Sequence, residues 1–229
     1  MIYYLLFNNN LTARDAILYF LISIFVYFVS LSLHEFAHAF VAVKMGDPTP
    51  KQAGRLTLNP FKHLDVMGFL CFMLVGFSWA KPVPVNPLNF KKYRKGMRAV
   101  SVAGITVNII LGLIAAGIYA IMLATLTFTS PAIHIIFVIL EYFMVVNSFL
   151  AMFNLLPIYP MDGFNLVTTF MKTENKFIKF SLRNGLKIML TLILISFATD
   201  LLFGFDLLDW YLTVLFNYVF KPIALLGVM

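Results

Sequence analysis

Charged residues are scarce in this sequence of 229 residues. Only 12% are Asp, Glu, Lys or Arg, whereas 61% are hydrophobic and the mean hydropathy is +0.90. Soluble globular domains are about 25% charged and about 45–50% apolar. The apolar residues gather in runs long enough to cross a bilayer, which takes about 20 residues of helix. The scarcity of charge therefore excludes an ordinary soluble domain and predicts an all-α integral membrane protein.

Cysteine and long polar stretches are also nearly absent. The single Cys71 excludes an internal disulfide framework and a zinc site built from several cysteines. No Pro-, Gly- or Ser-rich linker divides the chain, so we expect one membrane-embedded domain over 1–229, with a core at 16–165 and C-terminal helices at 184–226. The N-terminus lacks the basic segment and cleavage site of a secretory signal peptide, so the first apolar run is expected to stay in the membrane.

Five long apolar runs are expected to cross the bilayer as helices: residues 16–44, 99–127, 131–157, 184–203 and 206–226. Residues 66–80 are also apolar, but 15 residues are few for a span, and we expect a re-entrant segment there. Residues 45–65 hold too many glycines and prolines for a helix, and RLTL at 55–58 is predicted to form a short strand. The fold class is thus about five transmembrane helices with a re-entrant segment, or six spans if residues 66–80 cross.

The net charge of +7 could suggest a nucleic-acid partner, but the basic residues flank the apolar runs. If the N-terminus lies outside and residues 45–98 lie inside, 16 of the 17 Lys and Arg residues face the cytoplasm. This asymmetry is typical of membrane proteins and indicates the lipid bilayer, not nucleic acid, as the partner. We expect a multi-pass protein of the cell membrane, with a prokaryotic plasma membrane favoured over an organelle.

The sequence HEFAH at 34–38 is an H-E-x-x-H motif inside the first apolar run. His34 and His38 are four residues apart, so their imidazoles share one helical face and can bind one zinc ion. Glu35 stands beside them, where a general base could take a proton from metal-bound water. A pair of packed histidines with a carboxylate neighbour is the alternative. Ionisable groups within an apolar span are costly without a partner, and this favours the metal site.

Two histidines leave a zinc site short of its third protein ligand. The candidates in or near the membrane are His134, Glu141, Asp162 and Glu174. Asp162 stands out because Pro157 and Pro160 end the preceding helix and Gly163 frees the backbone just after it. The resulting turn falls at the same membrane side towards which HEFAH is displaced.

The order of five segments, HEFAH, GRLTLNPFKHLD, WAKPVPVNP, AGITVN and NLLPIYPMDG, resembles the site-2 proteases, which are intramembrane zinc metalloproteases. The resemblance covers almost all of residues 34–165. It implies a compact form of that family, because segments long enough for PDZ or CBS domains are not found in the sequence.

The resemblance implies a role for each matching residue. His34, His38 and Asp162 would be the ligands of one Zn²⁺ per chain, and Glu35 the catalytic base. Asn108 is similar to a family asparagine near the catalytic centre and is a second candidate catalytic residue, holding the oxyanion or the substrate carbonyl. A simple helix–helix hydrogen bond is the alternative for Asn108.

The resemblance also implies a membrane-associated β-hairpin near residues 54–60, to which an unwound substrate would add a strand. The sequence departs from the usual family pattern at three positions: Ile105, Met161 and Phe164. None of these removes a metal ligand.

The function that these features predict is a zinc endopeptidase of regulated intramembrane proteolysis. It would hydrolyse a peptide bond in or near the transmembrane segment of a single-span membrane protein. Three alternatives are a transporter or zinc-binding membrane protein, a non-catalytic relative that binds membrane proteins, and a zinc protease with a glutamate as third ligand.

Overall fold

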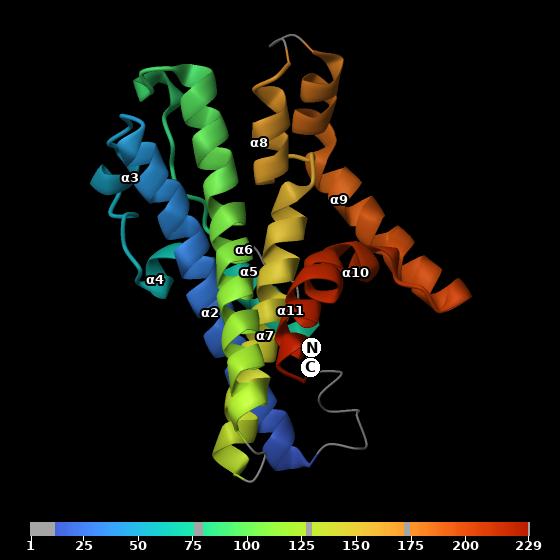
Figure 1. Cartoon of the computed structure of the whole chain (residues 1–229). Helices are drawn as coiled ribbons and strands as arrows, with labels where there is room; N and C mark the ends of the chain where they lie inside the picture. The colour runs from blue at the N-terminus through green and yellow to red at the C-terminus, as the bar shows by residue number, and fades with distance from the viewer. Residues whose placement is uncertain (1–11, 76–79, 127–129, 172–174, 229) are drawn as a thin grey trace.

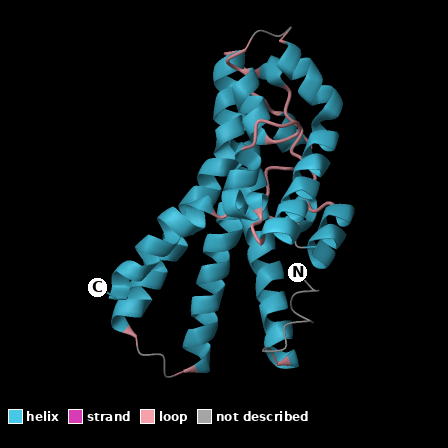
Figure 2. Cartoon of the chain, turned by 90° about the vertical axis from the view of Figure 1, so that its right-hand side faces the viewer, coloured by secondary structure: helices cyan, strands magenta, loops and turns pink. Residues whose placement is uncertain are grey.

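The computed structural model describes residues 12–75, 80–126, 130–171 and 175–228, in which helices make up nearly all regular structure (Figures 1 and 2). The α-helices are α2 (Ala13–Lys44), α3 (Thr49–Gln52), α4 (Pro60–His63), α5 (Val66–Val75), α6 (Tyr93–Thr125), α7 (Pro131–Leu155), α8 (Asp162–Thr168), α9 (Lys176–Phe203), α10 (Leu207–Leu212) and α11 (Lys221–Leu225). Shorter turns of other kinds are η1 (Pro87–Asn89), the π-helical η2 (Phe216–Phe220) and η3 (Leu226–Val228).

Local signals set both ends of α2, the helix that carries the HEFAH motif. The Thr12 side chain accepts a hydrogen bond of 3.2 Å from the backbone N–H of Asp15 and caps the first turn. At the other end Lys44 lies in the last turn, where a positive charge is favoured. Gly46 then has a φ of 109°, which glycine adopts readily and other residues rarely do. The chain therefore turns away shortly after the histidine pair.

Helices α2, α6 and α7 lie side by side and form the centre of the bundle (Figure 1). Small residues at their contacts, such as Ala39 and Ala116, are fully buried, as expected where helices approach closely inside a membrane. A methyl group on Gly112 of α6 would come within 2.2 Å of the Phe220 ring. The C-terminal pieces therefore pack directly on the α6 backbone.

The outward faces of the long helices are apolar. On α9, Leu186, Leu190 and Leu194 recur every four residues and are 64%, 51% and 66% exposed. Soluble proteins rarely expose such a continuous apolar surface, whereas a helix facing lipid does. Within the described ranges, four helices, α2, α6, α7 and α9, are long and apolar enough to cross a membrane. The prediction of a helical protein with long apolar helices is therefore confirmed, without the predicted number of spans.

The described residues hold four such helices, where the sequence predicts five. The run at 206–226 is divided among α10, η2, α11 and η3, and its apolar part, Phe216–Val228, is shorter than a span. Pro222 lies at the start of α11 and has no N–H to continue the preceding helical ladder. Gly227 packs against the carbonyl oxygen of Ala120, so this run follows α6 towards its Thr125 end.

The described residues contain no strand, so the strand predicted at 55–58 and the β-hairpin implied near 54–60 are wrong for this structure. Arg55 gives a physical reason. Its side chain is buried and donates hydrogen bonds to the backbone carbonyls of Lys62 and Lys81, which holds the segment as a folded loop. The regular pairing here is a single antiparallel bridge between Leu64 and Ala80.

The re-entrant segment expected at 66–80 begins as α5, and residues 76–79 lie outside the described residues. The Phe72 ring stacks on Tyr27 of α2 with ring centroids 4.3 Å apart, so α5 packs against the bundle. The bridge between Leu64 and Ala80 places the two ends of the segment next to each other. Whether the segment is re-entrant stays a prediction.

A buried carboxylate ties the end of α2 to the segment that precedes α6. Asp47 is fully buried and accepts hydrogen bonds from the backbone N–H groups of Thr49 and Asn86 and from the side chains of Thr49 and Asn89. Burial alone would raise the pKa of Asp47, but these hydrogen bonds outweigh it and lower the pKa. The carboxylate is therefore kept charged and holds the loop in place.

The turn after α7 brings α8 close to the bundle. A methyl group on Gly163 would lie 2.1 Å from the carbonyl oxygen of Leu155, so only glycine allows this approach. The N-terminal residue of α8 is Asp162, which the turn directs towards α2.

Candidate metal centre

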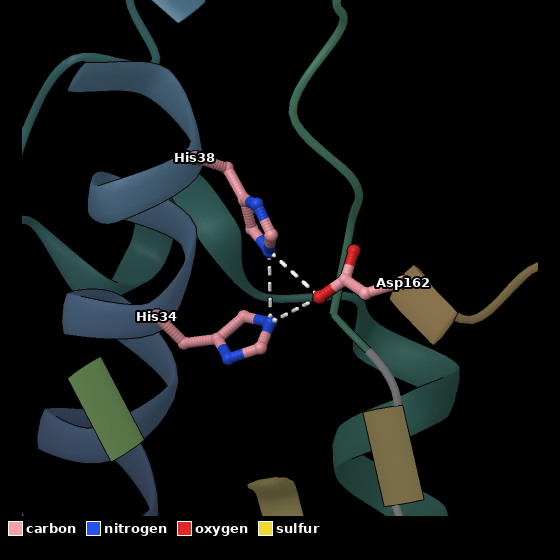
Figure 3. Close-up of side chains that lie close together, drawn as sticks. All are labelled: His34, His38 and Asp162. Atoms are coloured by element: carbon pink, nitrogen blue, oxygen red, sulfur yellow. Dashed lines mark hydrogen bonds and ion pairs between the residues drawn. The ribbon is translucent and has the colours of Figure 1, made fainter. Parts of the chain in front are cut away.

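Three side chains from two distant segments converge inside the bundle (Figure 3). His34 and His38 lie on α2 and are 3% and 7% exposed, and their Nε2 atoms are 3.0 Å apart. The Oδ2 atom of Asp162 lies 3.4 Å from Nε2 of His34 and 3.0 Å from Nε2 of His38. The spacing of HEFAH and the turn before α8 therefore bring together the three residues that the sequence predicts as ligands.

The three atoms have the spacing of a metal site. A zinc ion bound tetrahedrally at about 2.0–2.1 Å keeps its ligand atoms about 3.3 Å apart. The distances of 3.0, 3.0 and 3.4 Å are close to that value. Oδ2 of Asp162 is also buried without a hydrogen-bond partner in the described part of the chain. Two imidazole nitrogens and one carboxylate oxygen are suitable donors for zinc and leave the fourth position open.

The other ring nitrogen of each histidine is held by a hydrogen bond. Nδ1 of His38 lies 2.8 Å from the carbonyl oxygen of Val100 on α6. A carbonyl can only accept, so Nδ1 carries a proton and Nε2 is the nitrogen left to bind a metal. Nδ1 of His34 lies 2.6 Å from Oδ1 of Asn108, also on α6. Partners of this kind fix the orientation of metal-binding histidines.

Gly104 forms the wall of the site on the α6 side. A methyl group built there would lie 2.5 Å from Nε2 of His38 and 2.5–2.6 Å from Cε1 and Nε2 of His34. The residue is part of the AGITVN segment, but a sequence cannot indicate which face of α6 meets the histidines. The absence of a side chain at this position therefore makes room for the site.

The two predicted catalytic residues differ in their surroundings. Glu35 is 7% exposed and follows His34 directly on α2, but it is not one of the three converging ligands. The amide of Asn108 is fully buried, its oxygen faces His34 and its nitrogen donates to Asn147. In this arrangement Asn108 contacts a candidate ligand, and its predicted contact with an oxyanion or a substrate carbonyl stays a prediction.

The other candidates for the third ligand lie elsewhere. His134 and Glu141 are exposed on α7, and neither belongs to the cluster of potential ligands. Glu174 lies outside the described residues. Asp162 is thus the acidic residue that the structure places beside the histidine pair.

Comparison with known proteins finds relatives that are each described as a "putative zinc metalloprotease". The chain is 41% identical over 162 residues to "Putative zinc metalloprotease YwhC" of Bacillus subtilis, which covers 67% of this chain and 73% of the relative. It is 26% identical over 197 residues to "Putative zinc metalloprotease Rip2" of Mycolicibacterium smegmatis, covering 84% of this chain and 73% of that protein. No protein-family model and no solved structure matches the chain.

The match to YwhC combines high identity with coverage of most of both chains. The relatives are bacterial, and their names imply zinc. Independently of any name, the structure places two imidazoles and a carboxylate at the spacing that zinc requires. This chain therefore belongs to the zinc metalloprotease family that includes YwhC.

Proposed function

We propose that this protein is an intramembrane zinc endopeptidase that cuts other membrane proteins in or near a transmembrane segment. One observation carries the proposal. Three converging ligand atoms lie on the inner side of a bundle whose outer faces are apolar. A substrate that reaches them without leaving the membrane must itself be an apolar segment. The proposal includes regulated intramembrane proteolysis of single-span proteins, as in the site-2 proteases.

The residues of the site would have two roles, metal binding and proton transfer. His34, His38 and Asp162 would hold the metal and leave one position for water. A zinc ion bound there supplies Lewis acidity and can lower the pKa of that water to about 7. Glu35 would accept the proton of the water and pass it to the leaving amine. Burial of His34, Glu35 and His38 restricts bulk water, and Asp162 is half-buried on the side where the loops near α8 can provide a polar path.

The test is a comparison of new protein N-termini in membranes of cells that express the wild type or the Glu35→Gln variant. We expect cuts that depend on Glu35 and fall within apolar segments of single-span proteins. Cells with the empty vector provide the background. If every Glu35-dependent cut fell in soluble proteins or soluble domains, the proposed substrate class would be wrong.

We further propose that the site opens to the cytoplasmic side. The C-terminal end of α2 and the N-terminal end of α6 pack together, as the cluster of Ala42, Phe90 and Val100 indicates. The connection between these helices therefore leaves and returns at one end of the bundle, which agrees with a re-entrant 66–80 segment. This end also carries most basic residues, which favours the cytoplasm.

Labelling of single cysteines tests this topology after Cys71→Ala removes the native thiol. Cysteine would replace Lys51, Leu88, Ala132 or Lys176, each of which is exposed. Only the Ala132 variant should react with a membrane-impermeant maleimide in intact cells, and all four should react after permeabilisation. Reaction at position 88 but not at 51 in intact cells would mean that residues 66–80 cross the membrane.

A further inference from the structure

The Nδ1 atoms of the two histidines have different kinds of hydrogen-bond partner. Nδ1 of His38 contacts the backbone carbonyl of Val100 directly. His34 instead meets the side chain of Asn108, whose amide can present either its oxygen or its nitrogen to the ring. The orientation of this amide decides which nitrogen of His34 carries the proton. A second hydrogen-bond partner must therefore determine which way the Asn108 amide is turned.

Asn147 on α7 is the partner that orients the Asn108 amide. Nδ2 of Asn108 donates to Oδ1 of Asn147 at 2.7 Å, and Nδ2 of Asn147 donates to the carbonyl oxygen of Phe143 at 2.8 Å. Nδ2 of Asn147 also lies 2.9 Å from the hydroxyl of Ser30 on α2. Asn108, Asn147 and Ser30 are all fully buried, so water cannot replace any of these bonds.

The donor and acceptor of every hydrogen bond in this series follow from the chemistry of the groups. The carbonyl of Phe143 can only accept, so Asn147 must turn its nitrogen towards it and its oxygen towards Asn108. Asn108 then turns its nitrogen towards Asn147 and its oxygen towards His34. The proton of the imidazole must therefore lie on Nδ1, and the lone pair of Nε2 faces Asp162 and His38.

We propose that Asn147 is a positioning residue of the metal centre, which acts through Asn108 to hold the proton of His34 on Nδ1. This inference rests on the proposed metal site. Its alternative is a purely structural link between α6 and α7, because buried amides often join helices in membranes. The two roles differ in what they predict for the His34 ring: a structural link affects stability but not the tautomer.

The test uses the Asn147→Leu variant, which has similar volume but cannot form hydrogen bonds. Zinc affinity is measured in detergent by competition with a chelator. The His34 tautomer is measured in the zinc-free protein by nitrogen-15 NMR with labelled histidine, and a His34→Gln spectrum assigns the signal. We expect zinc affinity to fall by about 10–100-fold, which is typical when the partner of a metal ligand is lost. His34 should change from the Nδ1–H form to a mixture, while His38 stays unchanged.

Two other variants serve as controls. Asn184 on α9 makes the same type of bond, from Nδ2 to the carbonyl of Phe180 at 3.0 Å, but has no contact with the site. Asn184→Ala should leave zinc affinity and the His34 signal as in the wild type. Asn147→Asp, as the neutral acid that burial favours, keeps an acceptor for Asn108 and a donor for Phe143, so its zinc affinity should exceed that of Asn147→Leu by about tenfold.

The outcomes separate this inference from the proposed function. Asn147→Leu with wild-type zinc affinity and an unchanged His34 tautomer would overturn the inference, even if the variant melts at a lower temperature. An Nε2–H form of His34 in the zinc-free wild type would overturn it without any variant, should Asn147→Leu fail to fold. A wild type that binds no zinc would instead contradict the proposed metal site.

Discussion

Replacing Glu35 by Gln is expected to leave the zinc content of the purified protein unchanged and to slow peptide hydrolysis by about 10²–10⁴-fold. Glutamine has nearly the same shape as glutamate but cannot accept the proton of the attacking water. The ligand atoms are unaffected, because the converging groups are His34, His38 and Asp162. The variant should therefore separate metal binding from catalysis.

The measurement is single-turnover cleavage of a substrate found through its Glu35-dependent cut, with zinc quantified in the same samples. Glu141→Gln is the matched control, because Glu141 is exposed on α7 and lies outside the cluster of potential ligands. It should cleave at the wild-type rate. Cleavage by Glu35→Gln at more than a few per cent of that rate would show that another group is the base.

The Gly104→Ala variant is expected to lose zinc although it changes no ligand. Its methyl group would lie about 2.5 Å from ring atoms of both histidines, nearer than atoms can approach. In the zinc-free protein the rings can move aside, so the variant should still fold. Zinc binding requires both rings in place, and we expect affinity to fall by at least about 100-fold, the upper end for residues outside the ligand set.

Gly117→Ala on the same helix provides the control for this prediction. A methyl group there meets nothing within 4 Å. Because alanine favours helices by about 1 kcal/mol over glycine, this variant should be at least as stable as the wild type and bind zinc normally. Thermal unfolding of the zinc-free variants measures their stability, and competition with a chelator measures their zinc affinity. Wild-type zinc affinity in Gly104→Ala would mean that the metal does not lie where the histidine rings meet α6.

The sequence was sufficient to identify the features that depend on local spacing. Two histidines four residues apart must share a helical face, and the prolines and glycine around Asp162 predict the turn that releases it from α7. The structure then brings Asp162 to the histidines. Composition likewise predicts long apolar helices, and the part of the chain that the structure describes holds four of them.

Features that depend on contacts between distant segments could not be predicted in this way. The strand predicted at 55–58 does not form, because Arg55 binds carbonyls that follow it by 7 and 26 residues. The roles of Gly104 and Asn147 arise only when α6 and α7 pack against α2. Asn147 nevertheless carried a signal, since a polar residue within an apolar span indicates a functional site.

The central claim is that His34, His38 and Asp162 bind one zinc ion, and anomalous diffraction at the zinc edge tests it most directly. Crystals of the wild type, grown without added metal, should give a single anomalous peak per chain. The peak should lie about 2.0–2.2 Å from Nε2 of both histidines and from a carboxylate oxygen of Asp162. A protein without zinc, or a peak bound to other residues, would contradict the account.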